Sequence, residues 1–147
     1  MANFDFSRLR DLERLVGDRM DKVVRGTLLD LSRRIVLRTP VGNPSLWQGP
    51  PPPGYTGGQA RGNWQASIGS PASGTTTAID KTGTPTITSI AGETQNAPGN
   101  VWYLTNNLPY VSTALEYGSS TQAPTGMVRI SLRELDQSID DQISRLT

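Results

Sequence analysis

The carboxylates are the side chains of this sequence that could work as general acids or bases, but their spacing favours no such role. Asp140 and Asp141 are the closest pair. Neighbouring residues on a helix point about 100° apart, so these two make a poor acid–base dyad and a solvated helix face is the better interpretation. Asp80, Glu93 and Glu116 fall in segments that we predict to be turns, and no pattern in the sequence brings them together.

Two residue types that carry much of enzyme chemistry are absent. The 147 residues include no cysteine and no histidine, which excludes thiolate catalysis, zinc–thiolate sites and the commonest general base. No GxxxxGKS/T phosphate loop or strand-linked GxGxxG motif occurs. We therefore expect a protein that is not an enzyme, with no catalytic residues, no cofactor and no metal site. An acid-dependent hydrolase is the enzyme class that stays open as a hypothesis.

The basic residues gather near the N-terminus. Nine of the 14 Lys and Arg residues lie in residues 1–38, beside six acidic residues, which gives a local excess of +3 against +1 for the whole chain. A basic helix could contact phosphates, so a nucleic-acid-binding module that uses this Arg-rich helix is an alternative hypothesis. We favour an ordinary solvated face, because opposite charges alternate there at spacings of 3 and 4.

A single domain must position these residues. A chain of 147 residues is the length of one domain, and its 15 glycines and 11 prolines cluster in the middle. The ends read as helices and the centre as short strands, which predicts an α+β fold with a small antiparallel sheet and long loops. No segment approaches the roughly 18 apolar residues of a membrane span, and the N-terminus lacks the apolar stretch of a secretory signal. We expect folding in a cytoplasm, without a membrane partner.

Residues Asp5–Arg38 are predicted to form one long amphipathic helix that ends before Pro40. At about 1.5 Å per residue it would extend roughly 50 Å, too long for a compact domain with a radius of gyration of about 15 Å. We therefore expect the helix to bend, or to project and meet a partner. Its apolar stripe, with spacings of 3 and 4, comprises Leu9, Leu12, Val16, Met20, Val23, Thr27, Leu31 and Ile35. The part of it predicted to pack against the sheet or a neighbour is Leu12, Val16, Met20 and Val23.

Residues 41–60 form a predicted Pro/Gly-rich loop. Its run Pro50–Pro53 favours the polyproline II conformation, and loops of this length in small domains are usually functional or disordered. Trp47 and Tyr55 beside the run suggest a docking surface. A mobile insertion with two incidental aromatic residues is the alternative.

Alternating segments in residues 61–106 predict three short strands. They are Asn63–Gly69, Thr84–Ala91 and Val101–Asn106, with Trp64 and Trp102 facing inward. A short helical turn is expected after Pro109. Residues 124–146 are predicted to form the last helix, opened by Pro124 in the position that proline prefers, with Met127 on its apolar side.

Three segments resemble a known protein family. Thr39–Val41 (TPV) with Ala60–Trp64 (ARGNW) is similar to the TPVDTGRLRNSW signature of small siphophage tail-component proteins, and Asn106–Arg129 is similar to their N..PYA..LEYG.S.QAP.GMVR segment. These proteins are the minor tail, tail-completion or neck proteins of tailed bacteriophages. Their order of long helix, extended sheet and final helix is followed over nearly the whole chain. The loop of residues 41–60 departs from the pattern, since the family usually joins the first two segments within a few residues.

The resemblance implies a structural virion protein of the head–tail junction. The expected assembly is a ring of copies, six-fold in the family, between the head-completion or connector protein and the tail terminator or tail tube protein. Double-stranded DNA would pass non-specifically through its lumen, and assembly would take place in the host cytoplasm. A tail terminator or a minor tail protein at another layer is the alternative within the family.

Interface candidates follow from the two interpretations together. The aromatic residues expected in the sheet core or between subunits are Trp64, Trp102, Tyr110 and Tyr117. Those expected to contact an adjacent ring are Trp47 and Tyr55, with the Pro50–Pro53 run. Met127 completes the candidates.

Overall fold

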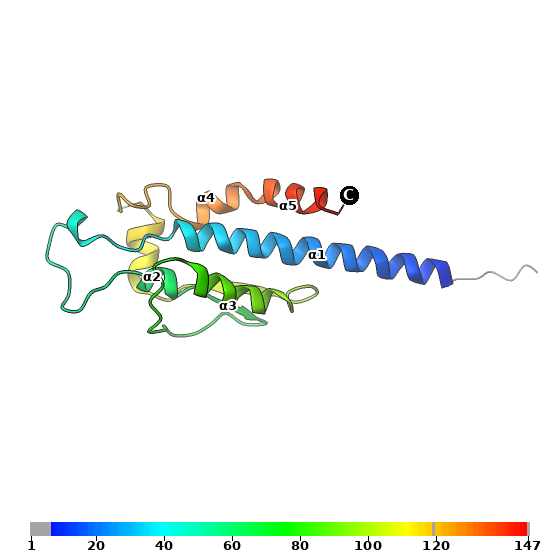
Figure 1. Cartoon of the computed structure of the whole chain (residues 1–147), viewed down its shortest axis with the longest axis horizontal. Coiled ribbons are helices and arrows are strands. Elements are labelled where there is room, and N and C mark those ends of the chain that lie inside the picture. The colour runs from blue at the N-terminus through cyan, green and yellow to red at the C-terminus, as the bar shows by residue number, and fades with distance from the viewer. Residues whose placement is uncertain (1–6, 119, 147) are drawn as a thin grey trace, which may run out of the picture.

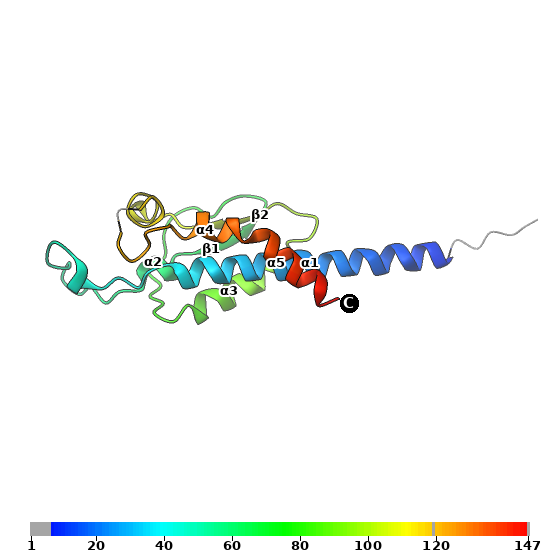
Figure 2. The same cartoon turned by 90° about the horizontal axis from the view of Figure 1, so that it is seen from above.

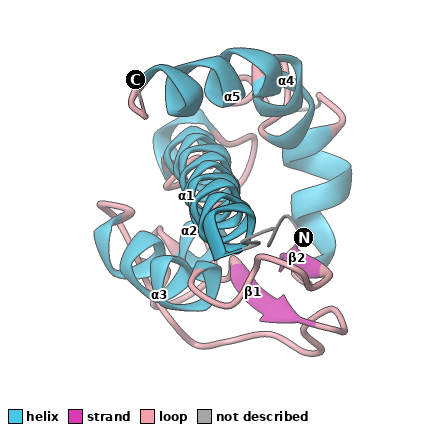
Figure 3. Cartoon of the chain, turned by 90° about the vertical axis from the view of Figure 1, so that its right-hand side faces the viewer, coloured by secondary structure: helices cyan, strands magenta, loops and turns pink. Residues whose placement is uncertain are grey.

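The computed structural model describes residues 7–118 and 120–146, and its mixture of helices and a small sheet confirms the predicted α+β class. In chain order the elements are α1 (Ser7–Arg38), the 3-10 turn η1 (Pro44–Leu46), α2 (Gln59–Gly62), β1 (Gln65–Ile68), α3 (Thr84–Thr94), β2 (Trp102–Thr105), the π-helical segment η2 (Val111–Glu116), α4 (Val128–Arg133) and α5 (Leu135–Ser144). Helix α1 forms the axis of the molecule. Helices α4 and α5 lie along one side of it, and α3 with the strands lies on the other (Figures 1 and 3).

The predicted long N-terminal helix is confirmed as the 32-residue α1, while Asp5 and Phe6 lie outside the described residues. Its end before Pro40 is also confirmed, and the amide of Thr39 closes the last turn on the carbonyls of Ile35 and Val36. Only the second half of α1 is covered by the rest of the chain. The first half projects beyond the body, as both side views show (Figures 1 and 2).

The sheet has two of the three predicted strands. Strands β1 and β2 pair antiparallel, with Gln65 opposite Thr105 and Ile68 opposite Trp102. The core is built between this two-stranded sheet, α1, α3 and the segment that precedes α4. Its buried members are Leu31, Ile35, Val36, Ala60, Trp64, Ile90, Leu108, Val111, Ala123 and Met127.

The prediction of a strand at Thr84–Ala91 is wrong, because this segment is helix α3. Two local features start a helix here: Gly83 adopts φ 89°, and Pro85 lies in the first turn, where proline costs no hydrogen bond. The buried Asp80 carboxylate accepts the amide protons of Gly83 (2.6 Å) and Thr86 (3.1 Å) and so caps that turn. The buried residues Thr86, Ile90 and Thr94 recur every four positions, a helical spacing that the polar–apolar alternation concealed.

The C-terminal helix is also not continuous as predicted. It divides at Glu134 into α4 and α5. At the break, the Glu134 carboxylate accepts hydrogen bonds from Arg34 (2.7 Å) and Arg38 (2.8 Å) of α1, and these ion pairs hold the pKa of Glu134 below its usual value. The break therefore lies where the C-terminal pair of helices is tied to α1.

Three further segments can be compared with the predictions. The predicted helical turn after Pro109 is confirmed as η2. The predicted loop of residues 41–60 contains the turn η1 and the start of α2. Within residues 7–118 and 120–146, no helix is both long and apolar enough to cross a membrane.

Two glycines inside α1 differ in their surroundings, and this difference supports a prediction. A Cβ at Gly17 would have nothing within 4 Å, whereas a Cβ at Gly26 would clash with the side chain of Gln142 on α5. Alanine is favoured over glycine in helices by about 1 kcal/mol. We therefore expect Gly17→Ala to raise the temperature at which the helical circular dichroism signal is lost. The increase should be smaller for Gly26→Ala, because Gln142 must move. Equal gains would contradict the close approach of α5 at Gly26.

Candidate functional site

The projecting first half of α1 carries an uncovered apolar face. We call residues 7–20 the overhang, and its face formed by Leu9, Leu12, Val16 and Met20 the overhang stripe. Leu12, Val16 and Met20 are 55%, 52% and 57% exposed. Full burial of such side chains is worth about 1.5–3 kcal/mol each, and contiguous exposed apolar patches mark interaction sites. The overhang stripe is therefore the leading candidate for an interface.

The structure settles part of the prediction for this helix face. Val23 is buried against the rest of the chain. Leu12, Val16 and Met20 are not, so the expectation that they pack on the chain's own sheet is wrong. The reason is geometric: the body ends before the overhang begins (Figure 1). Their contact with a neighbouring copy stays a prediction.

Charged residues of α1 are partly engaged within the chain. Arg34 and Arg38 bind Glu134, and Arg25 donates to the carbonyl of Gln95 (3.1 Å). These bonds hold three of the helix's basic side chains against Glu134, between α4 and α5, and against Gln95 at the end of α3. In the overhang, the pair of Arg14 with Asp11 is 4.0 Å long and largely exposed, and such pairs contribute little to stability.

The segments Thr39–Val41 and Ala60–Trp64 meet at the end of α1. Arg61 donates to the carbonyl oxygens of Thr39 (2.8 Å) and Lys81 (2.8 Å). The indole Nε1 of Trp64 donates to the hydroxyl of Thr39 (2.8 Å), which itself donates to the carbonyl of Ile35. Thr39 and Trp64 are buried. This cluster satisfies helix-end carbonyls and joins α1 to the segment that enters β1, so its role is structural.

Thr39→Val is expected to lower the free energy of unfolding by about 2 kcal/mol, because the buried Trp64 N–H loses its acceptor. Urea denaturation measures the loss. The matched background is Trp64→Phe, in which that N–H is already absent. There Thr39→Val should cost less, and equal costs in both backgrounds would contradict the assigned bond.

The segment Asn106–Arg129 is organised by Glu116, a role that the sequence did not reveal. Its carboxylate accepts the backbone amides of Met127 (2.8 Å), Val128 (2.9 Å) and Arg129 (2.9 Å) at the start of α4. Burial acts to raise the pKa of Glu116, but the hydrogen bonds from Val128, Met127 and Arg129 outweigh it and lower the pKa. The carboxylate thus acts as a distant helix cap. The one signal in the sequence was a glutamate ten residues before Gly126, the glycine that precedes the last helix.

The remaining carboxylates do not form a reactive group. Asp80 caps α3, Asp140 is exposed, and Asp141 accepts a hydrogen bond from Gln137. Among residues 7–118 and 120–146, no three acidic side chains gather so that they could hold a metal ion.

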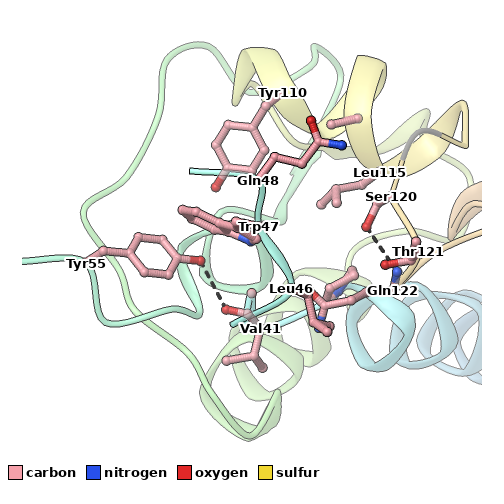
Figure 4. Close-up of a pocket in the computed structure, with 14 residues that line it drawn as sticks. Val41, Leu46, Trp47, Gln48, Tyr55, Tyr110, Leu115, Ser120, Thr121 and Gln122 are labelled. Atoms are coloured by element: carbon pink, nitrogen blue, oxygen red, sulfur yellow. Dashed lines mark hydrogen bonds between the residues drawn. The ribbon is translucent and has the colours of Figure 1, made fainter. Parts of the chain in front are cut away.

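A hollow of about 480 Å³ lies at the opposite end of the molecule from the overhang (Figures 1 and 4). The loop of residues 41–60 supplies Trp47 and Tyr55, whose ring centroids lie 4.8 Å apart. Tyr110, at the start of η2, faces them from the other side. We call these three residues the aromatic wall. The structure thus brings Tyr110 to two other predicted interface residues, Trp47 and Tyr55, which lie more than 50 residues earlier in the sequence.

The other predicted interface residues lie apart from the hollow. Trp64 is in the core, which was one of the two places predicted for it. Trp102 is half-buried and packs against the core. Tyr117 is 70% exposed, with the Arg129 guanidinium 5.5 Å from its ring centroid. Met127 is 0% exposed in the chain's own core, so its assignment to an interface is wrong. The apolar side of the last helix, on which Met127 was placed, faces inward at this position.

Comparison of the chain with protein-family models, with curated proteins and with solved structures finds no match. The fold, the overhang stripe and the hollow lined by the aromatic wall, which we call the aromatic hollow, are the features that bear on function.

Proposed function

We propose that this protein is a structural, non-catalytic virion protein of a tailed bacteriophage, a neck or tail-completion ring at the head–tail junction. Copies of the chain join the head connector to the tail tube, and double-stranded DNA passes through the lumen of the ring. The observation that carries the proposal is the overhang, whose stripe of apolar side chains is left uncovered by a chain of phage-like element order.

The overhang favours assembly over a monomeric role. A helix extension without tertiary contacts is marginal in water, so a partner that covers the overhang stripe stabilises the extension as well as the contact. The stripe differs from the apolar side chains exposed on the body, such as Leu132 and Ile143 of the C-terminal helices. We propose that the overhang stripe of one copy contacts the body of the next copy. Such a contact between two different surfaces is head-to-tail, and it forms a ring when the rotation closes. Six copies are expected from the resemblance.

The charge distribution agrees with a passage for DNA better than with a DNA-binding module. A net charge of +1 supplies little attraction for phosphates. Arg25, Arg34 and Arg38 are also held by other parts of the chain. The alternative of a nucleic-acid-binding module then depends on the exposed arginines of the overhang, Arg8, Arg10, Arg14 and Arg19. A tail terminator differs from a neck ring only in which partner the ring touches.

Mass measurement tests the proposal directly. The purified chain should form a closed oligomer whose mass is a multiple of 15.9 kDa, and the same chain should be present in assembled tails. A chain that stays monomeric and never enters particles would contradict the proposal.

A further inference from the structure

We infer that the aromatic hollow is a binding site for a polyproline II segment, and that its occupant is the Pro50–Pro53 run of a second copy of this chain. The inference deepens the proposed assembly role and rests on it for the requirement that copies meet. It concerns the end of the molecule opposite the overhang. The loop that carries both the run and two of the aromatic residues is the part of the chain that departs from the phage-like pattern.

The shape and lining of the hollow fit an uncharged, ring-bearing ligand. Its volume of about 480 Å³ falls within the range of about 300–1,000 Å³ that is typical of ligand sites. Trp47, Tyr55 and Tyr110 supply aromatic surface, and Leu46 and Leu115 supply aliphatic surface. Among the described residues that line it, none carries a charge. Aromatic-lined grooves of this kind recognise proline-rich segments.

The hollow also offers hydrogen-bond donors of the kind that such a segment needs. A polyproline II segment makes no internal hydrogen bonds. In this chain the Pro52 carbonyl already accepts the Tyr55 amide (3.1 Å), so the carbonyls of Pro50, Pro51 and Pro53 are those offered to a partner. Within the described part of the chain, the Trp47 indole N–H and the Tyr110 hydroxyl donate to no other residue. Burial raises the pKa of Tyr110, and the neighbouring Tyr55 raises it further, so its hydroxyl stays protonated at neutral pH. The amide of Gln122 lies at the same hollow (Figure 4).

The occupant is displayed by the chain itself. All four residues of Pro50–Pro53 are exposed, and none of them lines the hollow. At about 3.1 Å per residue the run spans roughly 9 Å in a conformation that proline sets in advance, so binding costs little ordering entropy. No other run of consecutive prolines occurs in the sequence.

The run of one chain is poorly placed to fill the hollow of that chain. It begins three residues after Trp47 and ends two residues before Tyr55, and these two rings touch each other as part of the aromatic wall. Its own run would have to enter the hollow past the wall to which it is tethered. A second copy has no such restriction. Because each copy carries both run and hollow, the contact can repeat around a ring or close as a two-fold pair.

Peptide binding to the full chain is the first test. A capped peptide with the sequence of residues 49–54 (GPPPPG) should bind saturably in calorimetry, and the same peptide with alanines in place of the prolines should not. Trp47→Ala should weaken binding at least tenfold, as loss of a central aromatic anchor does. Tyr117→Ala is the matched control, because Tyr117 is an exposed aromatic residue outside the hollow, and it should leave binding unchanged.

Cross-linking identifies the occupant. The chain has no cysteine, so two singly substituted proteins, Pro51→Cys and Gln122→Cys, can form only intermolecular disulfides. Mixing and oxidising them should give a mixed dimer that excess GPPPPG peptide suppresses. Ser73→Cys, exposed and outside the loop, replaces Pro51→Cys in the control and should give no such product.

Each outcome decides the inference. Peptide binding that depends on Trp47, together with the mixed cross-link, supports it. Absence of peptide binding overturns it, and so does peptide binding without the cross-link, which would assign the hollow to a proline-rich segment of another protein. Preference for an oligosaccharide over the peptide overturns it as well. If the hollow does not bind the run, the overhang-dependent oligomer should still form. If the proposed virion function is wrong, isolated chains should still bind the peptide, so the two failures are distinguishable.

Discussion

Replacement of Glu116 by glutamine is expected to lower the free energy of unfolding by about 2–3 kcal/mol. The Glu116 side chain is only 11% exposed, and its carboxylate accepts three backbone amides at the start of α4. Hydrogen bonds to a charged acceptor are worth about 1.5–3 kcal/mol. Glutamine keeps the size but loses the charge, and it turns an NH₂ group toward amide donors. Urea denaturation at neutral pH measures the difference.

The control for Glu116→Gln is Asp140→Asn, which removes an exposed carboxylate of α5. It should change stability by less than about 0.5 kcal/mol. Equal effects of the two substitutions would mean that Glu116 is not the cap of α4.

The pH dependence of stability should report the same carboxylate. The pKa of Glu116 lies below its ordinary value of 4.5 in the folded chain, so its contribution is fully present above that value and is lost as pH falls through the folded pKa. The pKa of Asp80 is also lowered, by hydrogen bonds at the start of α3 that outweigh its burial. The chain should therefore lose stability in acid below about pH 4.5, and Glu116→Gln should flatten that loss.

The double substitution Leu12→Asp with Val16→Asp is expected to abolish self-association. Both side chains lie on the overhang stripe and are about half exposed in the single chain, so the fold of one copy should hardly change. Burial of two unpaired carboxylates in an apolar contact costs several kcal/mol, which weakens association at least a hundredfold. Analytical ultracentrifugation measures the dissociation constant, and circular dichroism confirms that the helices persist.

The matched control for this pair is Arg14→Ala with Asp18→Ala. These positions lie on the opposite face of the same two turns of α1. They should leave the oligomer intact. A loss of association in the control equal to that of the stripe variant would mean that the charged face of the overhang, not the overhang stripe, drives assembly.

The elements that the sequence predicted correctly are those with redundant signals. Helix α1 combines a long apolar repeat with a stop at Pro40, and β1 and β2 combine aromatic residues with alternation. Helix α3 was mistaken for a strand because its short, β-branched sequence alternates. The decisive features were the left-handed backbone of Gly83 and the Asp80 cap, local signals that the alternation outweighed in the prediction.

The candidate surfaces were predicted only in part, because a pattern of apolar residues does not identify its partner. Leu12 and Leu31 both belong to the predicted stripe of α1, yet Leu31 is in the core and Leu12 is exposed. The aromatic residues of the loop were recognised from composition, but the approach of Tyr110 to Trp47 and Tyr55 depends on how η2 packs. Met127 was misassigned because the corner held by Glu116 turns it inward.

An image of the head–tail junction at side-chain resolution tests the central claim most directly. We expect a closed ring of this chain between the connector and the tail tube, with Leu12, Val16 and Met20 of each copy covered by a neighbouring copy. Particles in which the junction lacks this chain, or a ring in which the overhang stripe faces solvent, would contradict it.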